Sequence, residues 1–442
     1  MSPRRVVLGV GGLLLGAALG GLILWFAQRE PQVSGLPLDF RYLPRKTTAV
    51  AVRSRASAVA GTTGMRLQDA PPEVFWSSYA VLCGGWDVVR SVGHSDLSAH
   101  ALREPGYASA LRCGRALYER YGEKLDRHWL NFEDDDRVHS LLVVRLEGLE
   151  RLPEAEHLEP VDDEPKHLDE VGCMLKRGED RCDASAPTVA KIDGMPVWLV
   201  GRFSALESFA RRFDDDGDER LTGDLASMAK LHGELTGGYA CTVGDGDGYD
   251  SAFTRGFGLP AANGDERIEK LEERVEKDVE AWSMVLEGDP LVTELELRLV
   301  FWAESADKAE ELREDVEDVV DRLEKLLDDA VDEADDHAEE REKRSGRERA
   351  EFEVTDWQMS MRALAQASLE VEGERVILRL RQEPTDEQAR VVERYRQWQR
   401  DRTDTAVSIV RSLVDDEEIH PDDLGALDPE LPEAYRTAPR VD

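Results

Sequence analysis

Hydrophobic residues recur every three or four positions along two stretches in the second half of the chain, the spacing of an amphipathic helix. The first predicted helix runs from about Glu266 to Leu286, with an apolar face of Ile268, Leu271, Val275, Val279 and Trp282. The second is longer, and its apolar positions are Ala309, Leu312, Val316, Val319, Leu323 and Leu326. Because this stripe covers fewer than about four heptads, packing on the protein's own sheet is favoured over pairing with another chain.

Alternation of apolar and polar residues predicts the strands that accompany these helices. Residues 295–301 alternate as a half-buried strand, and residues 365–371 pair with residues 376–380 across a turn at Gly373. Thr385 and Gln388 form a capping box that begins a final helix. Beyond Asp328 the sequence is nearly all polar, and we expect that stretch to fray or project into solvent.

The first half of the chain contains the same kinds of segment. A strand is predicted at residues 47–53, and helices are predicted to begin at Pro72 and Pro105, since proline suits the first turn of a helix. Residues 140–146 and 195–201 have the continuous apolar composition of buried strands. Ser204 and Glu207 form a capping box that begins the next helix.

Both halves therefore follow the order strand, helical segment, strand, strand, helix. This order predicts an α+β fold built from two halves, and it suggests an ancient duplication although sequence identity between them is not evident. We expect a cytoplasmic stub and membrane anchor over residues 1–30 and a linker over 31–44. The first α+β half is expected over 45–264, the second over 265–420, and a loose tail over 421–442.

An uncharged run from Val6 to Ala27 predicts a helix that spans a membrane. At about 1.5 Å per residue it is long enough for a hydrocarbon core of about 30 Å. The run ends in large residues, including Trp25, instead of the small residues of a signal-peptide cleavage site, so we expect an uncleaved anchor. Arg4 and Arg5 favour a cytoplasmic N-terminus. The predicted protein is single-pass in the inner membrane, with most of the chain in the periplasm.

Three glycines in the predicted anchor, Gly12, Gly16 and Gly20, recur every fourth residue and share one helix face. Such a face lets two helix backbones approach closely, so a homodimer is one hypothesis. The alternative is that glycine is simply common in membrane-spanning helices.

Charge narrows the range of partners. The formal net charge of −37 argues against nucleic acid, which is normally bound by a basic stripe, and against anionic lipid headgroups. Excess carboxylates also suit a salty environment, in which self-repulsion is screened, or serve solubility alone. A protein or small-molecule partner stays open.

The five cysteines are Cys83, Cys113, Cys173, Cys182 and Cys241. Cys173 and Cys182 flank a short polar loop, so a local disulfide between them is the favoured pairing in an oxidising compartment. Cys83 with Cys113 is a second choice, because both lie on predicted helices. The odd number leaves at least one cysteine without an intrachain partner.

The strongest local candidate for a ligand site is an acidic segment from Asp214 to Leu225, between two predicted helices. Asp214, Asp216 and Asp218 would occupy ligand positions one, three and five of a calcium hand. Position six is Glu219 instead of glycine, and position twelve is Leu225 instead of glutamate. We therefore expect calcium to bind weakly or not at all, the alternative being a solvated acidic connector. A second Asp/Gly cluster, residues 244–250, is interpreted as a flexible loop.

No sequence motif identifies a cofactor or a catalytic residue. The chain lacks a G-x-S-x-G elbow, a Walker loop, G-x-G-x-x-G and H-E-x-x-H, and His94 and His100 have no spacing typical of metal ligands. A hydrolase with an unsignposted site and a calcium-responsive module are the alternatives to a binding or envelope-organising protein, which we favour.

Three segments resemble uncharacterised membrane-anchored extracytoplasmic proteins of GC-rich Gram-negative bacteria. They are FRYLPRKTTAVAVR (40–53), LCGGWDVVRSV (82–92) and WLVGRFSALESF (198–209). The resemblance implies the same anchored topology and carries no known activity.

Overall fold

The computed structural model describes residues 47–53, 59, 63–84, 101–103, 105–123, 127–134, 137–161, 165–174, 182–215, 240–244, 246, 249, 264–288, 295–428 and 431–437. The chain divides into two compact units, Met1–Pro37 and Leu38–Asp442, and every described residue belongs to the second. The predicted anchor, its three glycines and the predicted linker lie outside the described residues. Within the described ranges, no helix is both long and apolar enough to cross a bilayer.

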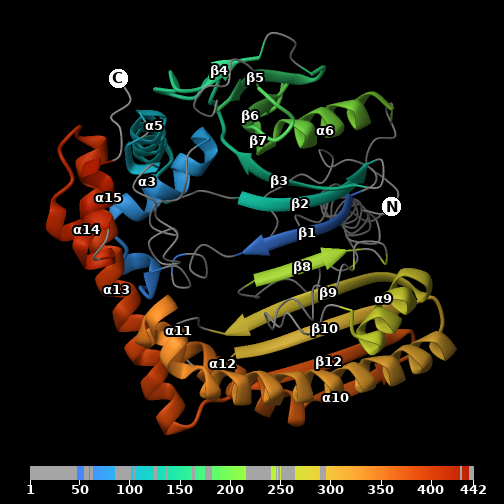
Figure 1. Ribbon diagram of the computed structural model, residues 1–442. Coiled ribbons are helices and arrows are strands. Elements are labelled where there is room, and N and C mark those ends of the chain that lie inside the picture. Colours follow the sequence, from blue (N-terminus) through green and yellow to red (C-terminus); the bar gives the residue numbers. More distant parts are fainter. Residues whose placement is uncertain are drawn as a thin grey trace, which may run out of the picture. The chain divides into compact units, whose positions relative to one another are not determined.

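Twelve strands form one sheet in the order β11-β12-β10-β9-β8-β1-β2-β3-β7-β6-β5-β4 (Figure 1). Each strand pairs with its neighbours in antiparallel register. The strands are β1 (Thr47–Arg53), β2 (Arg127–Asp134), β3 (Arg137–Arg145), β4 (Glu159–Pro160), β5 (Leu168–Cys173), β6 (Pro187–Ile192), β7 (Val197–Arg202), β8 (Ala240–Gly244), β9 (Val279–Gly288), β10 (Leu295–Ala303), β11 (Ser368–Glu372) and β12 (Arg375–Gln382).

Helices cover this sheet, and the described ones confirm the predicted α+β class. They are α3 (Pro72–Ala80), α5 (Pro105–Tyr121), α6 (Phe203–Asp215), α9 (Glu266–Asp278), α10 (Ala306–Asp336), α11 (Ala338–Ser345), α12 (Arg347–Ala365), α13 (Asp386–Val414), α14 (Pro421–Leu427) and α15 (Leu431–Thr437). Three short 3-10 helices are η2 (Leu67–Asp69), η3 (Val81–Cys83) and η4 (Ala101–Arg103).

The strand order is symmetric about the central β1–β8 pair. Outward from β1 come β2, β3, β7 and β6, and outward from β8 come β9, β10, β12 and β11. A helical connection follows both β1 and β8, and a helix follows both β7 and β12. The two sets of strands that correspond differ from the predicted halves. The counterpart of β1 is β8, whose residues 240–244 belong to the predicted first half. A strand of five residues has too little periodicity to be recognised.

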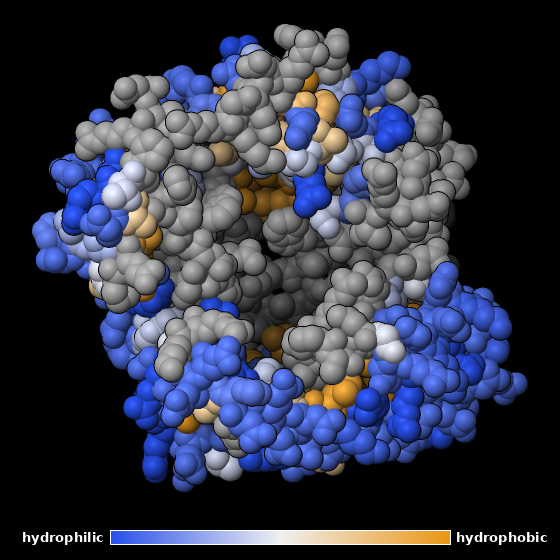
Figure 2. All heavy atoms as spheres, in the orientation of Figure 1, coloured by the Kyte–Doolittle hydropathy of each residue, from blue (hydrophilic) through white to orange (hydrophobic). Residues whose placement is uncertain are grey.

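Three hydrophobic clusters bury the two faces of the sheet. In the second half, β9, β10 and β12 pack against α9 and α10, with Leu312 and Phe301 both fully buried. This contact confirms that α10 packs on the protein's own sheet, and hydrophilic side chains cover the surface over α10 (Figure 2). The second cluster joins α3, α5, β3 and β7 to α13, α14 and α15, and the third joins β3, β6 and β7 to α6 and β9.

Two predictions about helices differ from the structure. The helix predicted over residues 266–286 ends at Asp278, and Val279 begins β9. Because β9 lies between β8 and β10 and is buried on both faces, its apolar residues Trp282 and Val285 imitate a helical period. The polar stretch after Asp328 is helical through α10 and α11, and α12 was not predicted at all.

The tail is also more ordered than predicted. Residues 421–427 and 431–437 form α14 and α15, whose Leu424 and Leu431 are buried in the cluster built around α3 and α5. These helices have seven residues each, too few to display a helical period in the sequence. Their stability comes from tertiary packing.

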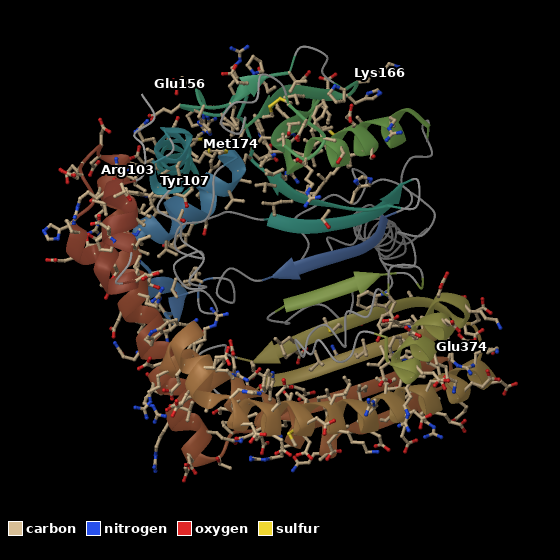
Figure 3. The ribbon with its side chains drawn as sticks, viewed as in Figure 1. Arg103, Tyr107, Glu156, Lys166, Met174 and Glu374 are labelled. Carbon is tan, nitrogen blue, oxygen red and sulfur yellow. A yellow bond between two sulfur atoms is a disulfide. The ribbon has the colours of Figure 1, made fainter. Side chains whose placement is uncertain are left out.

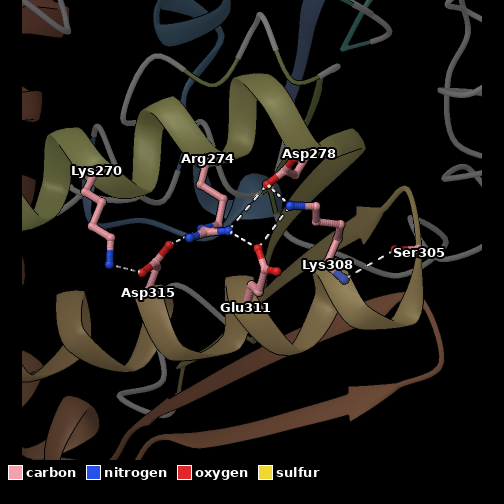
Figure 4. A network of polar contacts seen from close by, with 7 residues as sticks. All are labelled: Lys270, Arg274, Asp278, Ser305, Lys308, Glu311 and Asp315. Carbon is pink, nitrogen blue, oxygen red and sulfur yellow. Dashed lines mark hydrogen bonds and ion pairs between the residues drawn. The ribbon is translucent and has the colours of Figure 1, made fainter.

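A network of ion pairs around two buried carboxylates, Asp278 and Asp315, joins α9 to α10 (Figure 4). Asp315 accepts from Lys270, at 2.6 Å between Nζ and Oδ1, and from Arg274 Nε. Arg274 also contacts Glu311, at 2.6 Å, and Asp278, at 3.4 Å, while Lys308 contacts the same two carboxylates. The hydrogen bond to Asp315 raises the pKa of Lys270, which reflects the favourable contact between the two charges. The network fixes how the two helices pack.

Candidate functional site

Most of the candidate calcium segment lies outside the described residues. Asp214 lies in the last turn of α6, and Asp216, Asp218 and the rest of the segment to Leu225 lie outside the described residues. Elsewhere in the described part of the chain, no group of three His, Cys, Asp or Glu side chains is placed to hold a metal ion. The calcium hypothesis therefore stays a prediction.

The second Asp/Gly cluster, interpreted as a flexible loop, contains a core residue. Tyr249 is buried, and its ring meets those of Trp282 and Phe301 edge-on, at 5.4 Å between centroids in each case. Gly246 lies against the last turn of α9, where an added Cβ would come within 2.6 Å of the carbonyl oxygen of Val279. These contacts anchor the segment to the sheet by packing, which is a structural role.

Both expected disulfides are present. Cys173 is joined to Cys182 and Cys83 to Cys113, with Cα–Cα distances of 6.1 and 6.4 Å. Both distances lie within the usual range of about 4.4 to 6.8 Å. Next to the first bridge, Met174 approaches Gly84 on the side of the sheet that faces α3 and α5, so the two bridges brace one region (Figure 3).

That region contains a cavity of about 650 Å³ between the segment 150–160 and the strands β5, β6 and β7. Figure 3 labels Glu156 on this segment, beside β4. Apolar parts of the wall are Leu152, Ala155, Leu158 and Pro160. The polar residues around it are Glu150, Arg151, Asp169, Glu170, Lys191 and Trp198. A cavity of this volume is large enough to hold a small organic molecule.

The least exposed polar groups that line the cavity are hydrogen-bond donors. Lys191 and Trp198 are direct cross-strand partners on β6 and β7. The Lys191 side chain is 12% exposed, and its ammonium lies 3.1 Å from the carboxylate of Glu150, which is 87% exposed. Trp198 is 1% exposed, and its indole N–H has no hydrogen-bond partner among the described residues. An unpaired buried donor costs free energy unless an acceptor arrives.

Backbone strain gathers around the same cavity. Glu170, in its wall, has a φ of 51°, and nearby Glu154 and His167 have φ values of 50° and 65°. Left-handed backbone at residues other than glycine is unusual, and it clusters at functional sites more than elsewhere. A bulge between Asp169 and Gly172 accompanies this strain in β5.

A serine and a histidine meet beside the cavity, in a geometry that invites comparison with a hydrolase. Ser109 Oγ lies 3.0 Å from Nδ1 of His157, whose Nε2 lies 2.6 Å from the carbonyl oxygen of Cys83. Because that carbonyl only accepts, Nε2 carries the proton. Ser109 Oγ also lies 2.9 Å from the carbonyl oxygen of Glu154, so its one proton is shared between that carbonyl and Nδ1, and Ser109 is 8% exposed.

A nucleophilic serine needs a free approach for its substrate, which Ser109 lacks. Burial lowers the pKa of His157, which keeps the imidazole neutral near pH 7. The pair instead ties the segment 150–160 to α5 and to the carbonyl beside the Cys83–Cys113 bridge. It therefore holds one wall of the cavity in place, and next to it Leu158 packs against Gly84 and Gly172.

A second perturbed acid, Asp356, lies away from the cavity. It accepts a hydrogen bond from Gln382 Nε2 at 3.1 Å, and no cation of the described chain lies within ion-pair distance. Burial raises the pKa of Asp356 above its usual range. Ionisation of this carboxyl therefore disfavours the folded state. The free energy of unfolding falls as pH rises from the pKa of Asp356 in the unfolded chain to its higher pKa in the folded protein.

We expect Asp356→Asn to stabilise the protein by about 1 kcal/mol at pH 7, because it removes the charge and keeps the acceptor for Gln382. Below the unfolded pKa of about 3.9 both variants are neutral, so the difference should vanish. Urea denaturation of the wild-type protein and the variant at pH 7 and near pH 3.5 measures the difference in their free energies of unfolding at each pH. A variant that is less stable at pH 7 would show that the ionised carboxylate is well solvated.

The cavity residues were not identified from the sequence. Lys191 and Trp198 come from two strands joined by a tight turn, and the segment 150–160 has no periodic pattern that places it over them. One usable signal was the lone lysine, Lys191, a few residues before the predicted buried strand at residues 195–201.

We compared the chain with protein-family models, with curated proteins and with solved structures, and none of these comparisons found a match. Function must therefore be inferred from the chain's own residues and their geometry.

Proposed function

We propose that this chain is a single-pass inner-membrane protein whose periplasmic region binds a small organic ligand in the cavity beside Trp198. The observation that carries the proposal is the cavity itself, about 650 Å³ in volume, with two buried donors on neighbouring strands. Two disulfides and the Ser109–His157 contacts hold its walls. A rigid, partly polar cavity suits binding, because little ordering is needed when the ligand enters.

Binding is favoured over catalysis because the serine, the histidine and the cations in and beside the cavity already have hydrogen-bond or ion-pair partners. The serine–histidine pair is committed to backbone carbonyls, and the cations around the cavity are paired with carboxylates: Lys191 with Glu150 and Arg151 with Glu170, at 2.9 Å for the second pair.

A screen of small organic acids, amines and sugars by ligand-observed NMR on the full chain in detergent tests this proposal. We expect at least one class to bind, and Ala155→Trp to abolish that binding by filling the cavity. Ala338→Trp, on the exposed first turn of α11, is the matched control and should leave binding unchanged. If no compound distinguishes the two variants, the cavity is not a binding site.

The location of the protein is part of the same proposal. It is supported by the uncharged run from Val6 to Ala27 and, more weakly, by two disulfides that suit an oxidising compartment. A reporter active only in the periplasm, fused near Gly35, should report activity. Recovery of a mature chain that lacks the first thirty residues would contradict the uncleaved anchor.

We also propose that the two halves arose by duplication, on the strength of the symmetric strand order. The cavity lies over β5, β6 and β7, in the first half. In the second half the connection between β10 and β11 is made by α10, α11 and α12 instead of by β4 and β5. After duplication, divergence of this connection would leave a ligand-binding cavity in the first half and a purely structural role for the second half.

A further inference from the structure

We infer that the ligand of this cavity carries a carboxylate, which replaces Glu150 on Lys191; this inference rests on the binding function proposed above. Within the described chain, Glu150 is the only carboxylate within ion-pair distance of the Lys191 ammonium. Glu150 reaches the ammonium from the rim with a side chain that is 87% exposed, whereas Lys191 is nearly buried. The partner is therefore easily displaced, and the cation is not.

The unequal exposure of the two partners sets the direction of the exchange. A largely buried ammonium is destabilised by the loss of its hydration unless an anion stays close to it. Glu150 can turn into solvent and recover its full hydration, so releasing it costs little. A ligand carboxylate can then take the vacated position without leaving a charge unpaired.

Trp198 supplies the second contact. Its position directly across from Lys191 places the two side chains on the same face of the sheet, with Cβ atoms about 5 Å apart. An ammonium and an indole N–H are both hydrogen-bond donors, and one carboxylate, which only accepts, has two oxygens with which to satisfy them. The same carboxylate would satisfy the indole N–H that has no described partner.

The rest of the cavity indicates what the carboxylate is attached to. Leu152, Ala155, Leu158 and Pro160 form an apolar wall next to the two donors. Asp169, the cross-strand neighbour of Lys191 on β5, and Glu170 also line the cavity and disfavour a second anionic group. The expected ligand is thus a monocarboxylate with a small hydrophobic body.

Three probes with one hydrophobic body separate this inference from its alternatives: 3-(4-fluorophenyl)propanoate, the matching amide and the matching primary amine. Binding to the full chain in detergent is followed by fluorine NMR at 150 mM salt, where the long-range field of the acidic protein is largely screened. We expect the carboxylate to bind at least tenfold more tightly than the amide.

Two variants give the decisive signature. Lys191→Met keeps the apolar stem and should weaken carboxylate binding at least tenfold. Glu150→Gln removes the internal competitor and should strengthen it about threefold to fivefold, the effect of an exposed ion pair. Glu156→Gln, on the same segment but outside the cavity wall, should change nothing.

The outcomes distinguish the inference from the proposed function. If the amide or the amine binds as tightly as the carboxylate and Ala155→Trp abolishes this binding, the cavity is a binding site but the inferred preference for a carboxylate is wrong. Weaker carboxylate binding by Glu150→Gln also overturns the exchange. If neither the probes nor the broader screen detects binding that Ala155→Trp removes, both the inference and the proposed function fail.

Discussion

Replacing Gly114 with alanine is expected to destabilise the protein by about 3 kcal/mol, although alanine is the better helix former. Gly114 lies in α5 where this helix crosses α3. A Cβ at this position would lie 2.7 Å from the backbone nitrogen of Ala80 and closer still to the carbonyl oxygen of Trp76. Both atoms belong to the backbone of α3, so no side-chain rotation relieves the contact.

The helices cannot separate easily to make room. Cys113, next to Gly114, is bonded to Cys83 with 6.4 Å between their Cα atoms, and this bridge holds α5 to the end of α3. Strain at Gly114 should therefore spread into the cluster around Leu111 and Leu117. Urea denaturation of the full chain, followed by circular dichroism, measures the loss.

Gly106→Ala is the matched control, because it makes the same change in the same helix. The nearest atom to its added Cβ is 3.5 Å away, an ordinary van der Waals distance to the Cβ of His157. This variant should change the free energy of unfolding by less than about 0.5 kcal/mol. Equal stability of the two variants would mean that α3 and α5 do not cross as closely as described.

Asp315→Asn is expected to cost about 3 kcal/mol, the other large effect in this protein. Asp315 has 3% of its side chain exposed and accepts from both Lys270 and Arg274 (Figure 4). An asparagine can still accept from one cation, but its amide would point a donor at the other. The half-buried Arg274 would then lack its most deeply buried partner.

Glu311→Gln tests whether burial causes the effect. Glu311 lies one turn before Asp315 on α10 and also contacts Arg274, at 2.6 Å, but half of its side chain is exposed. Because water replaces most of what an exposed pair supplies, we expect a loss below about 1 kcal/mol. Thermal unfolding of both variants at low and high salt provides the measurement. Similar losses in both, each reduced by salt, would show that Asp315 is solvated.

Local patterns in the sequence determined many of the elements. The β11–β12 hairpin turns at Gly373, which has a φ of 67°, and the capping box of Thr385 and Gln388 begins α13 as predicted. The strand β10 and the long helix α10 also follow from periodicity alone. The bridge between Cys173 and Cys182 was predictable because nine positions along a polar loop keep the two residues close.

Only the tertiary structure decided which strands are neighbours and where the cavity lies. Strand β9 has apolar residues on both faces, so its period became clear only from its place between β8 and β10. The helices α14 and α15 are too short to be stable alone and depend on the cluster around α3 and α5.

The position of the cavity also depends on tertiary structure. Lys191, Trp198 and Glu150 come together through the pairing of β6 with β7 and the path of an aperiodic segment above them. Hydrophobic periodicity records which face of an element is buried, but it holds no information about what another element brings to that face. The sequence by itself therefore determined the α+β class and most helices, whereas long-range packing decided the candidate binding site.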